Sequence, residues 1–160
     1  MKKFVIAAVA VALSSGSAFA ATANGSATAE VVSPITLTHT PAATINFGMI
    51  DAGTGGSVTV TTAGAGTAGG GATLVAGSVN SADAFTVTGG ASRGYTIATA
   101  AGTVNSGVNS MSFTTVPSAA TATLSVVGLG AFTVGGTLTV PAGQVPGSYT
   151  GSYVATVLYQ

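Results

Sequence analysis

Few side chains in this sequence could do chemistry, and their spacing does not form a catalytic pattern. The chain has one histidine, His39, and no cysteine, so a transition-metal site and a catalytic triad both lack their usual residues. Asp51 and Asp83 stand among Gly, Ser and Asn, where an aspartate side chain commonly bonds to the backbone of a turn. The sequence therefore predicts no catalytic residue, no metal site, no cofactor and no enzymatic activity, with His39 on a strand surface.

One glycine-rich stretch has the spacing of a dinucleotide-binding turn, at Gly64, Gly66 and Gly69. That turn binds a pyrophosphate only when a strand precedes it and the N-terminus of a helix follows it. No helical pattern follows Gly69. We therefore interpret residues 63–72 as a flexible hairpin loop between two strands.

Residues 1–20 have the features of a secretory signal peptide. Lys2 and Lys3 precede an apolar run at residues 4–13, and the small residues Ala18 and Ala20 end the segment. The run is too short to span a bilayer. We expect cleavage after Ala20 and export through the inner membrane into the periplasm.

Residues 21–160 carry very few charges and have the length of one domain. Arg93 is their only basic side chain, against Glu30, Asp51 and Asp83. The lack of a basic patch argues against nucleic acid as a partner, and a surface so near neutral favours association. The composition therefore fits a protein that works in an assembly, and without cysteine its fold must rest on burial and backbone pairing.

Apolar residues alternate with Thr and Ser after residue 20, which is typical of strands buried on one face. Turn residues, among them Gly89-Gly90 and Gly135-Gly136, separate these runs. Strands recurring about every ten residues predict an all-β antiparallel sandwich or barrel of about nine strands. The alternating positions are Ile35/Leu37, Ile45/Phe47, Val58/Val60, Phe85/Val87, Tyr95/Ile97, Met111/Phe113, Leu124/Val126, Phe132/Val134, Leu138/Val140 and Tyr153/Ala155/Val157/Tyr159.

Both ends of the expected mature chain read as strands. The other face of the C-terminal strand carries Val154, Thr156 and Leu158, which predicts that the strand is covered on both sides over part of its length. At the start, residues 21–31 alternate Ala, Gly or Val with Thr, Asn, Ser or Glu. Pro34 removes a backbone donor and the phase breaks before it, so this segment has no obvious hairpin partner.

The C-terminal spacing resembles that of the pilins of chaperone–usher fimbriae. Those subunits end in an alternating strand with a penultimate tyrosine, here Tyr159, and a glycine fourteen places from the terminus, here Gly147. The mature chain is also similar to an uncharacterised bacterial family related to the common-pilus major subunits and to spore-coat-U-like proteins. The segments that carry this similarity are residues 45–48, 85–89, 95–97, 135–138 and 144–149.

This resemblance implies an immunoglobulin-like antiparallel β-sandwich that is incomplete, with an open groove beside the C-terminal strand. The implied organisation is a signal peptide at residues 1–20, an N-terminal extension at 21–33 and a pilin domain at 34–160. The implied partners are identical or related subunits, a periplasmic chaperone and an outer-membrane usher. The implied product is a fibre at the cell surface that serves adhesion or biofilm formation. No motif identifies a host or surface receptor.

In such a fibre the N-terminal extension of one subunit enters the groove of its neighbour as an added strand. The donor residues would be Ala21, Ala23, Gly25, Ala27, Ala29 and Val31. The chaperone or neighbouring subunit would contact Gly147, Tyr153, Ala155, Val157, Tyr159 and the terminal carboxylate of Gln160. This chain departs from many pilins in having no disulfide and a donor segment of mostly alanine, so we hypothesise shallow pockets opposite Ala23, Ala27 and Ala29.

Two other classes of protein stay open as alternatives. A small outer-membrane β-barrel also uses alternating strands, although such barrels carry aromatic girdles and this chain has no tryptophan. A secreted carbohydrate-binding or matrix module would present exposed aromatic rings, for which Tyr95, Tyr149 and Tyr153 are candidates. Ladders of material sheared from cells would favour the fibre, whereas a closed monomer that binds glycan would favour the module.

Overall fold

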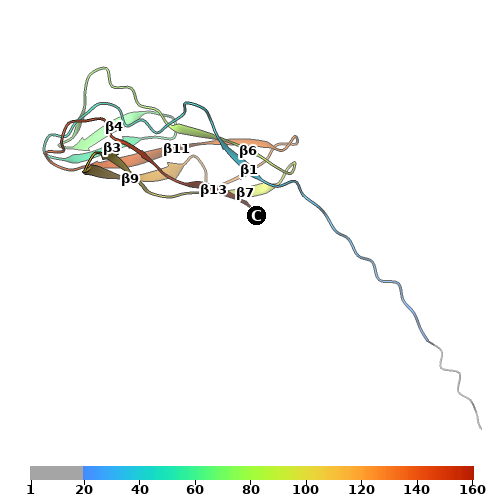
Figure 1. The fold of residues 1–160 in the computed structure, drawn as a ribbon. Helices are drawn as coiled ribbons and strands as arrows, with labels where there is room; N and C mark the ends of the chain where they lie inside the picture. The colour runs from blue at the N-terminus through green and yellow to red at the C-terminus, as the bar shows by residue number, and fades with distance from the viewer. Residues whose placement is uncertain (1–19) are drawn as a thin grey trace, which may run out of the picture. The chain divides into compact units, whose positions relative to one another are not determined.

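The computed structural model describes residues 20–160, and every regular element in this range is a β-strand (Figure 1). The predicted signal peptide lies outside the described residues, apart from Ala20. The strands are β1 Thr36–His39, β2 Ile50–Asp51, β3 Gly56–Val60, β4 Gly66–Gly70, β5 Thr73–Leu74, β6 Asp83–Thr88, β7 Gly94–Thr99, β8 Gly102–Ser106, β9 Asn109–Pro117, β10 Thr121–Thr123, β11 Leu129–Val140, β12 Thr150–Ser152 and β13 Ala155–Tyr159.

The chain separates into two units at residue 30. In the described part of the first unit, residues 20–30, every residue is exposed and no strand forms. The second unit, residues 31–160, contains all the described strands.

The longest strand, β11, organises the second unit. Its first half pairs with β6 and its second half with β3 on the same edge, while β9 pairs along its other edge. The larger sheet has the order β1-β6-β11-β9-β8-β12, with β3 and β4 attached to β11, and a smaller sheet has the order β10-β7-β13. All these pairings are antiparallel, and Figure 1 shows β3, β4 and β9 toward one end of β11 and β6, β1, β7 and β13 toward the other.

The core consists of two clusters, one at each half of β11. In the first, Phe85, Val87, Phe132 and Val134 of the larger sheet meet Tyr95, Ile97 and Val157 of the smaller sheet. The second cluster lies around β3, β9 and the end of β11, and Ile45 and Tyr153 pack against both clusters. Because the two sheets enclose the first cluster, the prediction of an all-β antiparallel sandwich is confirmed. The second cluster is Phe47, Val58, Val60, Ala72, Met111, Phe113, Leu138 and Val140.

The prediction that Gly135-Gly136 separates two strands is wrong, because both residues lie inside β11. Here β11 changes its neighbour from β6, which ends its pairing at Val134, to β3, which begins at Gly136. A Cβ added to Gly135 would overlap the carbonyl oxygen of Val60 and come within 2.8 Å of the backbone nitrogen of Thr62. This glycine is required by the close approach of another backbone and not by a turn.

Other local predictions also differ from the structure, since residues 20–160 form thirteen strands and not about nine. The supposed loop at residues 63–72 contains β4, which pairs with β3 although its small side chains give no apolar alternation. The Ile45/Phe47 run forms only an isolated bridge, between Asn46 and Ser81. The pattern at Leu124 lies beyond the end of β10, although Leu124 itself is buried.

Candidate functional site

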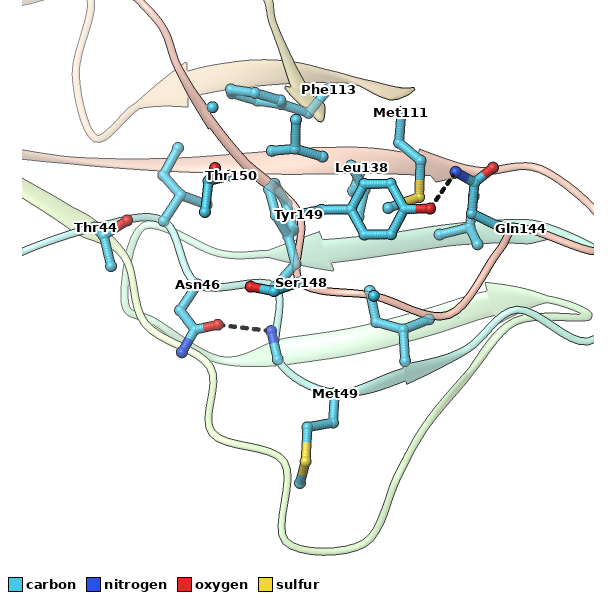
Figure 2. Close-up of a pocket in the computed structure, with 18 of the residues that line it drawn as sticks. Thr44, Asn46, Met49, Met111, Phe113, Leu138, Gln144, Ser148, Tyr149 and Thr150 are labelled. Carbon is cyan, nitrogen blue, oxygen red and sulfur yellow. Dashed lines mark hydrogen bonds between the residues drawn. The ribbon is translucent and has the colours of Figure 1, made fainter. Parts of the chain in front are cut away.

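A groove opens on the second unit beside the segment that leads into β13. It has a volume of about 1180 Å³ and is lined mainly by residues 43–53 and 143–153, together with apolar side chains of β8, β9 and β11 (Figure 2). This exceeds the roughly 300–1,000 Å³ of a typical small-molecule pocket, so the groove has room for an extended chain segment. The apolar side chains from these strands are Val104, Met111, Phe113, Leu138 and Val140.

One wall of the groove is held in place by a tyrosine. The hydroxyl of Tyr149 donates to the carbonyl oxygen of Val145 (2.7 Å) and accepts from the side-chain nitrogen of Gln144 (2.9 Å), the bond drawn in Figure 2. Its ring packs against the second core cluster. Residues 141–149, between β11 and β12, are therefore fixed against the core without being part of a sheet.

β13 is the end strand of the smaller sheet and pairs only with β7 among the described strands. Ala100 N donates to Val154 O (2.9 Å) and Gln160 N donates to Gly94 O (3.1 Å), so the even-numbered residues bond to β7. Bonding positions alternate along an antiparallel strand. The backbone groups of Ala155, Val157 and Tyr159 therefore point away from β7, on an open edge.

β1 has an open edge of the same kind, since it pairs only with β6 among the described strands. Thr40 N donates to Ala84 O (3.0 Å), so the backbone groups of Leu37 and His39 point away from β6. β1 and β13 approach within 8 Å between Cα atoms, which is closer than the roughly 9.5 Å that two strands need to hold a third between them. The wide part of the groove therefore lies beside residues 143–155 and reaches only the first residue of β13.

The predicted inward face of the C-terminal strand is confirmed, because Val157 is buried and Tyr153, Ala155 and Tyr159 are partly buried. The prediction that the other face is also covered is wrong within this chain. Val154 is 65% exposed and Leu158 is 61% exposed, since the described residues provide no further layer over the smaller sheet.

A polar cluster lies at the inner end of the groove, where β1, β6 and the segment before β13 meet. Asp83 is 5% exposed, and its Oδ2 accepts from the hydroxyl of Tyr153 (2.8 Å). Its Oδ1 accepts from Nε2 of His39 (2.7 Å) and from the backbone N–H of Ala84 (2.8 Å). Three donors thus satisfy this buried carboxylate, as burial of a charge requires. The cluster ties three segments together.

Tyr153 also joins the two core clusters through its ring. The ring meets Phe85 of the first cluster edge to face at 6.3 Å and Phe113 of the second at 6.2 Å, between ring centroids. Burial raises the pKa of the Tyr153 phenol, and the hydrogen bond to Asp83 and the charge of Asp83 raise it further. Tyr153 therefore stays a neutral hydrogen-bond donor at physiological pH.

The penultimate residue, Tyr159, ties together the two ends of the domain sequence. Its hydroxyl accepts from the backbone N–H of Gly90 (2.6 Å) and donates to the carbonyl oxygen of Ser33 (2.8 Å). A Cβ added to Gly89 would overlap this hydroxyl, so the turn between β6 and β7 needs glycine there. Tyr159 therefore fixes the point at which the chain before β1 leaves the domain.

Replacing Tyr159 with phenylalanine should lower the free energy of unfolding by about 1–2 kcal/mol, because the Gly90 N–H and the Ser33 C=O both lose their partner. Hydrogen exchange followed by mass spectrometry should show faster exchange at Gly90. Tyr149→Phe is the matched control, since it also removes one hydroxyl but lies in the other half of the domain. Equal exchange at Gly90 in wild type and Tyr159→Phe would contradict the role given to this hydroxyl.

The structure brings together part of the predicted site. Tyr153 and Ala155 line the groove, and Gly147 lies at its outer part, where an added Cβ would come within 2.8 Å of Oγ of Ser106. Val157 and Tyr159 lie on the inward face of β13 beyond the groove, and Gln160 follows them. The predicted donor residues Ala21, Ala23, Gly25, Ala27, Ala29 and Val31 are exposed and outside any strand.

Sequence reasoning missed the wall at residues 43–53 and the pairing of His39 with Asp83. Asp51 does accept from Gly53 N (3.1 Å), as a turn aspartate should. Asp83 bonds the local backbone as well, but two of its partners lie 44 and 70 residues away in sequence. The sequence did carry one signal for these bonds, which is that Asp83 continues the apolar alternation of Phe85 and Val87. A carboxylate at an inward position is buried and therefore needs hydrogen-bond donors.

The described residues contain no group of three or more His, Cys, Asp or Glu side chains suited to a metal ion. Nor does this range contain a helix long and apolar enough to cross a membrane.

Comparison with known proteins gives one match. The model of a domain family of unknown function, DUF4402, matches residues 35–159. No curated protein and no solved structure matches the chain. The matched range begins just after Ser33 and includes both core clusters, the groove, the polar cluster and Tyr159. This chain is a member of the DUF4402 family.

Proposed function

We propose that this protein is a structural subunit of a bacterial surface fibre, and that the groove of each subunit takes up the N-terminal extension of another. The observation that carries the proposal is the apolar groove, which lies beside residues 143–155 and ends where the open edge of β13 begins. An open edge beside apolar side chains readily pairs with an added strand. On this proposal the domain is an immunoglobulin-like sandwich that lacks one strand.

The length of the extension supports its role as the added strand. The segment at residues 23–31 has nine residues. The segment that runs along the groove, from Gly147 to Ala155, also has nine. At about 0.8 kcal/mol per buried methyl-sized group, the three inward alanines Ala23, Ala27 and Ala29 would contribute about 2.4 kcal/mol, and Val31 about 1.5–2 kcal/mol. Backbone hydrogen bonds to the segment at residues 147–155 would supply much of the remaining stability.

The other partners follow from the resemblance to chaperone–usher pilins. A subunit with an empty groove would expose apolar surface and unpaired backbone in the periplasm, so a chaperone would cover it until an usher passes it to the fibre. The terminal carboxylate of Gln160 is the group that the chaperone would hold. The fibre would serve adhesion or biofilm formation, and the protein would have no enzymatic activity.

Replacing Ala27 with tryptophan should abolish fibre formation, because an indole in the middle of the added strand cannot enter a site shaped for a methyl group. The chain should still fold, because Ala27 lies outside the strands of the domain. Circular dichroism would report the fold, and electron microscopy of sheared surface material would report fibres.

Thr28→Trp is the matched control for this experiment. It adds the same side chain one residue further, on the face that points away from the groove, and should leave fibres in place. Normal fibres from the Ala27→Trp variant would refute the assigned inward face.

A further inference from the structure

We infer that the two ends of the domain carry complementary apolar patches through which consecutive copies of this chain touch, an inference that rests on the proposed function. The exit patch consists of Val32, Val126, Val127 and Leu129. The mouth patch, at the outer part of the groove, consists of Met49, Val108 and Val145. The partner of each exit patch is the mouth patch of a second copy.

The exit patch surrounds the point where the N-terminal extension leaves the domain. Val126 is 83% exposed and Val127 is 72% exposed, at the turn that leads into β11. Gly89 N donates to Gly128 O (2.9 Å), which holds this turn against the turn between β6 and β7. Val32 lies beside Gly90 in that second turn, and the next residue, Ser33, is bonded to Tyr159.

The mouth patch lies at the other end of the same domain. Leu129 begins β11 and Val140 ends it, which places about 36 Å between the two ends of the strand. Met49 and Val145 line the groove beyond Val140, and each is about half exposed. Gly147 contacts Ser106, and this brings the groove wall to the turn between β8 and β9, which carries the fully exposed Val108.

Chain length forces these two patches together once the extension is inserted. The inserted strand must leave the groove at the mouth, because β1 and β13 are too close at the inner end. Ser33 is held to the domain by its bond to Tyr159. With Val31 in the groove of the next copy, the two residues from Val31 to Ser33 span about 7 Å at most. The exit patch of one copy therefore faces the mouth patch of the next. Such a head-to-tail contact repeats into an open filament and not into a closed dimer.

Engineered cysteines test this contact directly, because the chain has no cysteine of its own. The chain beginning at Ala21 would be prepared as Val127→Cys and as Val145→Cys, the two would be assembled together, and the fibres would be oxidised. We expect disulfide-linked dimers in the mixture. Val116→Cys, which is 58% exposed on β9 in the middle of the domain, is the control and should form none with either variant. Dimers from Val127→Cys alone would overturn the head-to-tail contact.

A charge substitution separates this inference from the proposed function. Val127→Asp should slow fibre elongation about tenfold or more, because it buries an unpaired carboxylate at the contact. Binding of a synthetic peptide of residues 21–31 to the same variant should be unchanged, and Val116→Asp should elongate normally. Normal elongation of Val127→Asp with intact peptide binding would overturn the patches alone. Failure of the unsubstituted chain to bind the peptide would overturn the proposed function, and the patches with it.

Discussion

Replacing Tyr153 with alanine should lower the free energy of unfolding by about 4 kcal/mol. The substitution removes the ring that meets Phe85 and Phe113 and leaves a cavity where the two core clusters join. It also takes one of three donors from Asp83, a carboxylate that is 5% exposed. Since a domain of this size has a stability of about 5–15 kcal/mol, a shift of the denaturation midpoint in urea should be evident.

Tyr153→Phe divides this effect into its two sources. It keeps both ring contacts and removes only the hydroxyl, so we expect a loss of about 1–3 kcal/mol from the weakened solvation of Asp83. The difference between the losses in the two variants measures how much the ring contributes to the free energy of unfolding. If alanine and phenylalanine were equally destabilising, the ring would not link the clusters.

The second large effect is expected at Gly135, where alanine should destabilise the domain by about 3 kcal/mol. The added methyl group would overlap the carbonyl oxygen of Val60 and press on the backbone of Thr61 and Thr62. The strand cannot move away, because β11 is paired with β9 on its other edge. Thermal unfolding followed by circular dichroism would measure the loss.

Gly69→Ala is the matched control, because Gly69 is also a strand glycine but its added Cβ would meet nothing closer than 3.7 Å. We expect a change within about 0.5 kcal/mol at this exposed position. Similar losses of stability at both glycines would mean that strand propensity, and not the close approach of the Val60 backbone to Gly135, determines the destabilisation.

The inward faces of the main strands could be predicted because side-chain alternation is a local property of a strand. Val58 and Val60, Phe85 and Val87, and Phe132 and Val134 are buried as their spacing indicates. The same rule gave the inward face of the C-terminal strand, from Tyr153 to Tyr159. Length and alternation were therefore sufficient for the fold class.

The remaining features depend on contacts between distant parts of the chain. β4 is built of Gly, Thr and Ala, so only its pairing with β3 defines it. Gly135 looks like a turn residue until the backbone of Val60 is placed beside it. Likewise, the wall of the groove at residues 43–53 is held by long-range bonds such as the one from Asn80 Nδ2 to Phe47 O (2.8 Å). No local sequence pattern predicts such a bond.

The pairing of β1 with β6 determines how the domain would respond to mechanical force. A pull on the N-terminal extension enters at Ser33 and acts along β1, at right angles to the hydrogen bonds of its ladder with β6. The four residue pairs of that ladder are then strained together in shear, instead of unzipping one after another from an end. All four pairs must therefore give way together before β1 separates from β6.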